Sequence, residues 1–123
     1  MLIAPLRYIN DNKLTVWTSV PSVGMFMDQV GQLKPGCMPS LRLSLFCGEG
    51  LPCDLARKWK GAAVNSKVIN FYGPTEFTVN STFYALKNSK SLKEIPIGKV
   101  LPGVKYLIKK EKNSNRGELF LAG

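Results

Sequence analysis

LRLSLFCGEG (residues 41–50) and KVINFYGPTE (residues 67–76) are the two stretches that decide the fold of this 123-residue chain. Leucines alternate with other residues in the first, as in a β-strand, and the second begins with the next predicted strand. Each strand is followed by a glycine-containing turn. A helix is expected from Pro52 to Gly61, because apolar residues recur there at helical spacing. Those residues are Leu55, Ala56 and Trp59. The order strand, helix, strand predicts parallel strands joined by a helical crossover.

An earlier strand and helix extend this pattern toward the N-terminus. Residues 14–18 are rich in β-favouring side chains and predict a short strand. Ser19 is a candidate N-cap, Pro21 suits the first turn of the following helix, and the Lys-Pro-Gly run at residues 34–36 would end it. Helical spacing predicts one buried face on this helix, formed by Val23, Phe26, Met27, Val30 and Leu33.

The character of the sequence changes from Phe77 onward. Strands without intervening helices are predicted at residues 77–86, 104–109 and 118–121. Turn-rich segments are predicted at residues 88–93, 102–103 and 113–117. The predicted fold class is α/β, with parallel strand-helix-strand units followed by an antiparallel β segment. We expect a single partial domain, with an α/β part over residues 1–86 and a mostly β part over residues 87–123.

Composition excludes several kinds of catalytic site. The chain has no histidine, so it cannot by itself build a Ser-His-Asp or Cys-His nucleophilic site. Its three cysteines, Cys37, Cys47 and Cys53, include no C-x-x-C pair, so neither a disulfide framework nor a zinc site is expected. Any chemistry must rest on carboxylates, hydroxyls, lysines or backbone groups.

The net charge of +9 comes from 17 basic and 8 acidic residues. Such a balance can indicate nucleic-acid binding, but these lysines are scattered and lack interleaved aromatic residues. We therefore expect no nucleic-acid partner, with a basic nucleic-acid-binding domain kept as an alternative. No apolar run has the length of a membrane span, and the first residues lack the features of a signal peptide. We expect no membrane partner and a cytoplasmic location.

The two glycine-containing turns are the candidate ligand site. If the two strands are parallel neighbours, both turns leave the carboxyl ends of strands, which is the edge where open α/β sheets bind ligands. Gly48 and Gly50 would let a flat ring approach the backbone, and Tyr72 offers a face for stacking. Thr75 offers a hydroxyl to a phosphate, and Glu76 offers a carboxylate of the kind that binds magnesium. From spacing alone, a tight turn with Thr75 and Glu76 facing solvent is the simpler interpretation.

Four ordered segments resemble a known family. NFYGPTE (residues 70–76) resembles the N-x-Y-G-P-T-E signature of adenylate-forming enzymes, most of all the amino-acid adenylation domains of nonribosomal peptide synthetases and the D-alanine–carrier-protein ligases. LFCGEGLP (residues 45–52) resembles the family's strand and glycine loop. IPIGKVLPG (residues 95–103) resembles its P-I-G segment, although Lys99-Val100 stands where a basic residue and proline are usual. GELFLAG (residues 117–123) resembles the start of its G-E-L motif.

The resemblance implies roles for individual residues. Tyr72 would stack on adenine, Thr75 would touch the α-phosphate, and Glu76 would hold Mg²⁺, so Thr75 and Glu76 are the catalytic candidates. The implied nucleotide-binding residues are Gly48, Glu49, Gly50, Asn70, Tyr72, Gly73 and Thr75. The implied walls of the acid pocket are Leu45, Cys47, Phe71, Val79 and Asn80. For Leu45, Phe71 and Val79, plain core packing accounts for the sequence equally well.

The resemblance also implies a function for the parent protein. It would be an ATP-dependent ligase that activates a carboxylic acid, an amino acid above all, as acyl-AMP, and passes it to the phosphopantetheine thiol of a carrier protein. The implied fold is part of the large N-terminal domain of such an enzyme. The lysine-containing phosphate loop, the ribose-binding aspartate and the lid lysine are not found here, so the chain is expected to be an internal fragment, inactive alone and prone to self-association through exposed apolar surface. The alternatives are an acyl- or aryl-CoA ligase fragment and a non-catalytic nucleotide- or protein-binding module.

Overall fold

The computed structural model describes residues 4–87 and 92–123. Its helices are α1 (Pro5–Asp11), α2 (Pro21–Gln29), α3 (Cys53–Ala62) and a short 3-10 helix, η1 (Thr75–Phe77). Its strands are β1 (Val16–Ser19), β2 (Leu43–Phe46), β3 (Lys67–Tyr72), β4 (Thr82–Ala85), β5 (Lys99–Val100), β6 (Lys105–Lys110) and β7 (Gly117–Ala122). Residues 88–91 of the predicted turn at residues 88–93 lie outside the described part.

One sheet of five strands, in the order β1-β2-β3-β4-β5, organises the body of the molecule. β1, β2 and β3 are parallel neighbours, with Leu43 paired to both Val16 and Lys67. β4 then pairs antiparallel with β3, and β5 antiparallel with β4. This arrangement confirms the predicted α/β class, with parallel units followed by antiparallel strands. The short strand β5 was not predicted from the sequence, and it places residues 99–100 in the main sheet.

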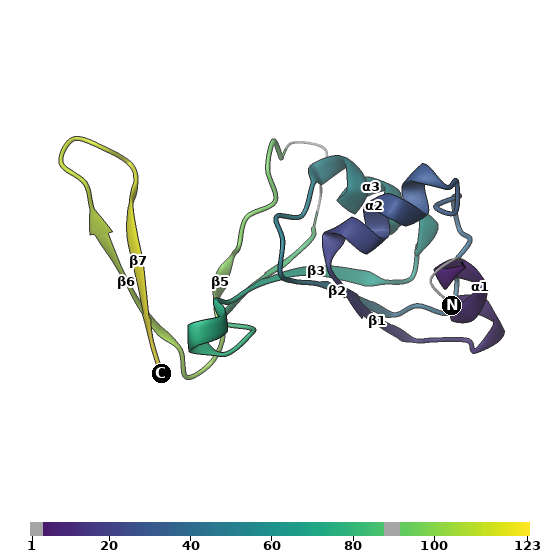
Figure 1. Ribbon diagram of the computed structural model, residues 1–123, viewed down its shortest axis with the longest axis horizontal. Coiled ribbons are helices and arrows are strands. Elements are labelled where there is room, and N and C mark those ends of the chain that lie inside the picture. The colour runs from purple at the N-terminus through teal and green to yellow at the C-terminus, as the bar shows by residue number, and fades with distance from the viewer. Residues whose placement is uncertain (1–3, 88–91) are drawn as a thin grey trace.

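The core lies between this sheet and helices α2 and α3, which cover the same face of it (Figure 1). Phe46 of β2 meets Trp59 of α3 edge to face, with ring centroids 5.0 Å apart. Leu55 and Ala56 are also buried, so the predicted inner face of α3 is confirmed. Because Phe46 points toward the helices, the strand alternation turns its neighbour Leu45 toward the opposite face of the sheet.

The predicted buried face of α2 is confirmed at Met27 and wrong at Phe26 and Val30, while Val23 is half-buried and Leu33, beyond the end of the helix, packs half-buried against the core. The buried residues are Pro21, Gly24 and Met27, whereas Phe26 is 42% exposed and Val30 is 49% exposed. The helix packs against α3 through Gly24, where an added Cβ would lie 3.2 Å from both δ-methyl groups of Leu55. The orientation of α2 is therefore set by the close contact of Gly24 with Leu55, and not by the apolar residues at helical spacing.

The predicted ends of α2 are also corrected. Ser19 belongs to β1 and accepts a hydrogen bond from the Trp17 indole, so Val20 takes the N-cap position without a side-chain cap. The helix ends at Gln29, before the Lys-Pro-Gly run at residues 34–36. The amides at residues 31 and 32 donate to the Asp28 and Met27 carbonyls, which is the Schellman pattern of helix termination.

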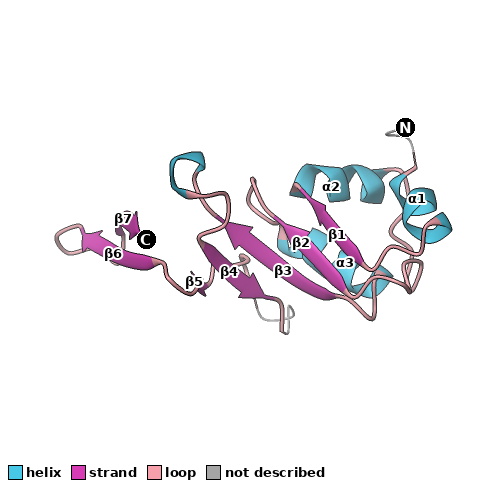
Figure 2. Ribbon diagram, turned by 90° about the horizontal axis from the view of Figure 1, so that it is seen from below, coloured by secondary structure: helices cyan, strands magenta, loops and turns pink. Residues whose placement is uncertain are grey.

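The strand predicted at residues 77–86 begins only at Thr82. Residues 75–77 form η1 instead, and Thr78 adopts a φ of +47°, so the chain turns before it can join the sheet. α1 is a further element that the sequence pattern did not predict. Figure 2 shows η1 at the end of β3, on the opposite side of the molecule from α1.

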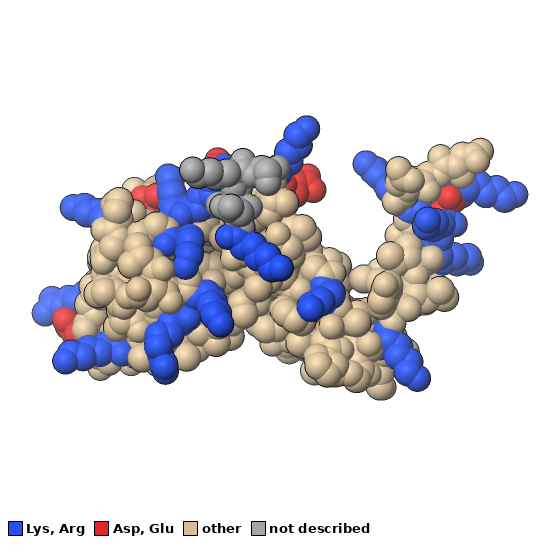
Figure 3. Space-filling model, turned by 180° about the vertical axis from the view of Figure 1, so that it is seen from behind, with Lys and Arg blue, Asp and Glu red and all other residues tan. Residues whose placement is uncertain are grey.

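The predicted strands at residues 104–109 and 118–121 are confirmed as β6 and β7, which pair as an antiparallel hairpin. The hairpin projects from the body of the molecule (Figure 1). Its strands carry exposed apolar side chains, among them Tyr106, Leu107, Ile108 and Phe120. Lysine and arginine side chains are distributed over both the body and the hairpin, as Figure 3 shows. No helix within residues 4–87 and 92–123 is both long and apolar enough to cross a bilayer.

Candidate functional site

An open cavity of about 250 Å³ lies at the carboxyl ends of β2 and β3. Because these strands are parallel neighbours, the turns that follow them meet at one edge of the sheet. The residues lining the cavity are Gly48, Glu49, Gly50, Asn70, Phe71, Tyr72, Gly73, Ile95 and Ile97. The structure thus brings together all the residues of the implied nucleotide site except Thr75.

Asn70 lines this cavity, and its side chain contains a buried polar atom without a partner. The side chain is 5% exposed, and its Nδ2 donates a 3.0 Å hydrogen bond to the Pro96 carbonyl. Among the described residues its Oδ1 is buried without a hydrogen-bond partner. A buried carbonyl oxygen without a partner costs free energy, so a ligand donor that formed a hydrogen bond to this oxygen would gain that free energy on binding.

Tyr72 occupies the last position of β3 and stays 37% exposed while lining the cavity. Ile95 and Ile97 line it from a distant part of the sequence. Two buried side chains hold this segment in place, since Asn70 donates to the Pro96 carbonyl and Thr82 donates to the Ile97 carbonyl at 2.7 Å. The cavity therefore combines a phenol ring with branched aliphatic side chains, a lining suited to a flat, largely apolar ring.

Ile95 and Ile97 were not assigned to the site from the sequence. The signal was their spacing of two around Pro96, within a segment already identified as a family motif. Spacing alone could not show that residues 95–97 return to the end of β3, because Asn70 and Pro96 are separated by 26 positions in the chain.

Gly73 has no room for a side chain. A Cβ at this position would lie 2.6 Å from the carbonyl oxygens of both Thr78 and Val79, so the turn after η1 folds back directly over the glycine. Ser81 closes the same turn, because its amide donates to the Tyr72 carbonyl at 2.8 Å and its hydroxyl donates to the Phe77 carbonyl at 2.9 Å. The loop at residues 73–81 is thereby held compactly at the end of β3.

Thr75 and Glu76 are the first residues of η1 and are both exposed. They lie outside the lining of the cavity but follow Gly73 by only two and three positions. Glu76 has no companion set of ligands, since residues 4–87 and 92–123 contain no group of three or more His, Cys, Asp and Glu side chains that could hold a metal. A lone carboxylate can hold a magnesium ion only where the ion keeps several waters or takes its other oxygens from a bound ligand.

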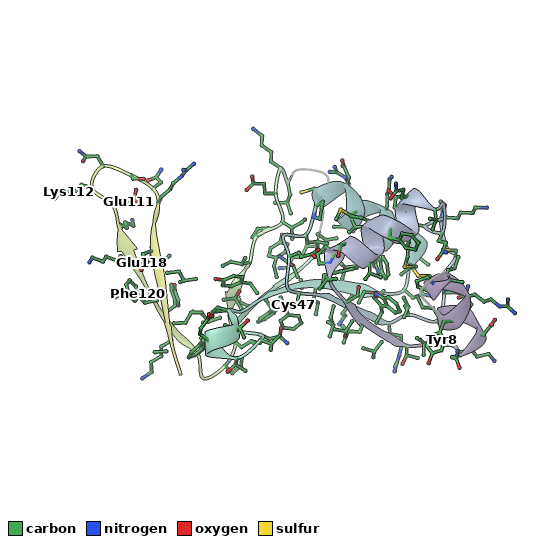
Figure 4. All side chains as sticks on the ribbon, in the orientation of Figure 1. Tyr8, Cys47, Glu111, Lys112, Glu118 and Phe120 are labelled. Atoms are coloured by element: carbon green, nitrogen blue, oxygen red, sulfur yellow. The ribbon has the colours of Figure 1, made fainter. Side chains whose placement is uncertain are left out.

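The residues of the implied acid pocket divide into two groups. Leu45 and Phe71 are half-buried on the sheet face away from α2 and α3, where Phe71 packs against Phe83 at a centroid distance of 6.4 Å. The Cys47 thiol donates to the Val79 carbonyl at 3.4 Å, which joins the end of β2 to the loop after η1. Val79 and Asn80 are exposed. In Figure 4, Cys47 lies in the central part of the molecule, well away from the hairpin residues Glu118 and Phe120.

Comparison with known proteins adds family relationships to this geometry. The family model described as AMP-binding enzyme matches residues 2–123. The D-alanine--D-alanyl carrier protein ligase of Bacillus licheniformis is 30% identical over 122 residues, a match that covers 94% of this chain and 24% of that protein. The chain thus spans about a quarter of the length of the curated relatives it matches.

Solved structures share the fold. The Vibrio cholerae adenylation domain AlmE, crystallised with glycyl-adenosine-5'-phosphate, is 38% identical, with a TM-score of 0.78 over 94% of this chain and 21% of that chain. IdnL7 is 35% identical, with a TM-score of 0.87 over 96% of this chain and 25% of that chain. The mixed α/β arrangement of parallel and antiparallel strands is common to this chain, AlmE and IdnL7.

Proposed function

The chain belongs to the family of AMP-binding enzymes, and from this premise we propose that it is a segment of an ATP-dependent ligase that activates a carboxylic acid as its acyl-AMP. In this reaction an oxygen of the acid's carboxylate attacks the α-phosphorus of ATP and forms a new oxygen–phosphorus bond. The bond between the α-phosphorus and the oxygen that bridges to the β-phosphate breaks, and pyrophosphate leaves with that oxygen. The observation that carries the proposal is the cavity at the ends of β2 and β3, with the unpaired Asn70 Oδ1 at a site suited to a flat ring.

In this proposal the cavity holds the adenine ring. Tyr72 stacks on the ring, the backbone of residues 48–50 and Gly73 allow its close approach, and Asn70 Oδ1 accepts a hydrogen bond from the exocyclic amino group. Ile95 and Ile97 complete the apolar wall. The phosphates then extend from Gly73 toward η1.

Thr75 and Glu76 are proposed to act on the phosphates. The Thr75 hydroxyl donates to the α-phosphate, which orients that phosphorus for attack. Glu76 holds Mg²⁺ together with the phosphate oxygens, and the ion would supply neutralisation of the phosphate charge. Both side chains are exposed and lie on the short helix that follows the cavity, so a bound triphosphate can reach them.

An amino acid is the proposed substrate class. The name of the Bacillus relative specifies D-alanine, and the AlmE structure contains a glycyl adenylate. Leu45, Cys47, Phe71, Val79 and Asn80 are proposed to form its pocket, which is mostly apolar with one amide. The proposed acceptor is a carrier-protein thiol, in keeping with the name of that relative. We propose the cytoplasm as the location, because ATP is available there.

Amino-acid-dependent exchange of pyrophosphate into ATP tests the proposal. The complete product of the encoding gene should catalyse this exchange with one or a few amino acids and should load a carrier protein. The 123-residue chain alone should give none, because no lysine-containing phosphate loop is present in its sequence. Exchange that depends only on fatty or aryl acids, with transfer to coenzyme A, would replace the amino-acid proposal with the CoA-ligase alternative. A complete, folded product without exchange for any acid would refute the ligase function.

A further inference from the structure

The loop at residues 48–50 contains two glycines, so it has few side-chain contacts that could fix its conformation. Gly48 and Gly50 flank Glu49, all three residues are exposed, and all three line the cavity. Gly48 has a φ of +92°, in the region that glycine adopts readily. Glycine backbone loses the most conformational freedom when it is ordered. We therefore expect contacts with other parts of the protein to hold this loop in one conformation.

Glu49 supplies that attachment through helix α2. Its Oε2 accepts a 2.9 Å hydrogen bond from the backbone amide of Ser22, and its Oε1 accepts a 3.1 Å hydrogen bond from the Ser22 hydroxyl. Ser22 is the second residue of α2, where backbone amides have no partner within the helix and the helix dipole favours a negative charge. The carboxylate is therefore engaged with the helix, and the same residue lines the cavity.

The helix end to which Glu49 binds is itself fixed. Pro21, Gly24 and Met27 bury α2 against the core, so Ser22 is held by packing on the same helix. Neighbouring contacts bring the loop to the same place. The Cys47 amide donates to the Ser19 carbonyl at 3.3 Å, and a Cβ on Gly48 would lie 3.2 Å from Val20 Cγ1.

We propose that Glu49 is a positioning residue, whose carboxylate fixes the loop at residues 48–50 to the first turn of α2. This contact sets the position of the loop against which the nucleotide ring lies. This inference rests on the proposed function. It differs from the role implied by the family resemblance, because the Glu49 side chain acts through Ser22 and not on the nucleotide.

Steady-state pyrophosphate exchange by the complete gene product, with the acid saturating, tests the inference. Glu49→Ala should raise the KM for ATP by roughly three- to tenfold, the range expected for a charge-assisted hydrogen bond that is partly screened by solvent. The kcat and the KM for the acid should change much less. The phosphate-binding residues lie on η1, and Cys47, the acid-pocket residue next to the loop, is held by its own hydrogen bonds to the Val79 and Ser19 carbonyls. Glu49→Gln should retain most of the ATP affinity, since an amide oxygen can still accept from the Ser22 amide.

A double-mutant cycle separates positioning from general stabilisation. Ser22→Ala removes the hydroxyl bond but keeps the amide bond, so its effect on the KM for ATP should be smaller than that of Glu49→Ala. The double variant should be no worse than Glu49→Ala alone, because both changes remove the same attachment. Asp54→Ala is the matched control, since it removes another exposed carboxylate, which pairs with Arg57 in the first turn of α3.

The outcomes are distinct. If the wild-type protein shows ATP-dependent exchange and Glu49→Ala leaves the KM for ATP unchanged, the positioning role is overturned while the proposed function stands. Additive effects of the two substitutions would also overturn it. If the wild-type protein shows no ATP-dependent exchange, the proposed function fails and this inference fails with it. If Glu49→Ala does not fold, the double variant Glu49→Gln with Ser22→Ala decides the matter, because it removes both the negative charge and the hydroxyl bond. An unchanged KM for ATP in that variant overturns the role.

Discussion

Substitution of Asn70 by alanine should weaken nucleotide binding and remove discrimination at the purine 6-position. The Asn70 side chain is 5% exposed, its Nδ2 donates to the Pro96 carbonyl, and its Oδ1 has no partner among the described residues. In the proposed complex this oxygen accepts from the 6-amino group of adenine. Inosine carries a carbonyl at the same place, so two acceptors would face each other and inosine triphosphate should bind poorly.

The size of the effect follows from the burial of these groups. Leaving a buried partner unsatisfied costs about 1–3 kcal/mol, which corresponds to a factor of roughly 5–150 in the dissociation constant. Asn70→Ala should therefore raise the dissociation constant for ATP by about tenfold or more, while that for inosine triphosphate changes little. Loss of the bond to Pro96 should also lower the free energy of unfolding by about 1 kcal/mol, because one net hydrogen bond is removed.

Calorimetric titration of the complete gene product with each nucleotide measures the effect, and urea unfolding reports stability. Asn65→Ala is a matched control, because Asn65 also donates a 3.0 Å Nδ2 bond to a proline carbonyl, that of Pro39, but is exposed on another part of the chain. Its affinity for ATP should equal that of the wild type. Equal losses of affinity for ATP and inosine triphosphate in Asn70→Ala would refute the assignment of Oδ1 to the 6-amino group.

Three further changes test the loop, the core and the hairpin. Gly73→Ala would place a Cβ 2.6 Å from the Val79 carbonyl oxygen, so the loop must move, and ATP affinity in titration should fall by more than about tenfold; unchanged affinity would contradict the described loop. Phe46→Leu should lower the free energy of unfolding, measured with urea, by about 1–2 kcal/mol through loss of the edge-to-face contact with Trp59, and no change would contradict that packing. Leu107 is 64% exposed on β6, so Leu107→Lys should reduce self-association of the 123-residue chain in sedimentation velocity. A wild-type chain that stays monomeric at high concentration would contradict the expected self-association.

The elements nearest the site could be predicted from the sequence because their signals are local. The bounds of β3 and the inner face of α3 follow from alternation, helical spacing and flanking Pro and Gly residues. Parallel pairing of β2 and β3 follows from the helix between them. Once the pairing is known, the turns at residues 48–50 and 73–76 must leave the same edge of the sheet, so the place of the site was determined by sequence order.

The tertiary structure decided which side chains face one another, because those contacts join residues far apart in the chain. Periodicity showed that α2 has an apolar side, but contact with Leu55 at Gly24 selected the face that is buried. Asn70 meets Pro96 across 26 positions, and Glu49 meets Ser22 across 27, so no local pattern could reveal either contact. The sequence by itself therefore determined the family, the sheet edge and the residue types of the site. Only long-range packing decided that residues 95–97 close the cavity and that the Glu49 carboxylate binds a helix.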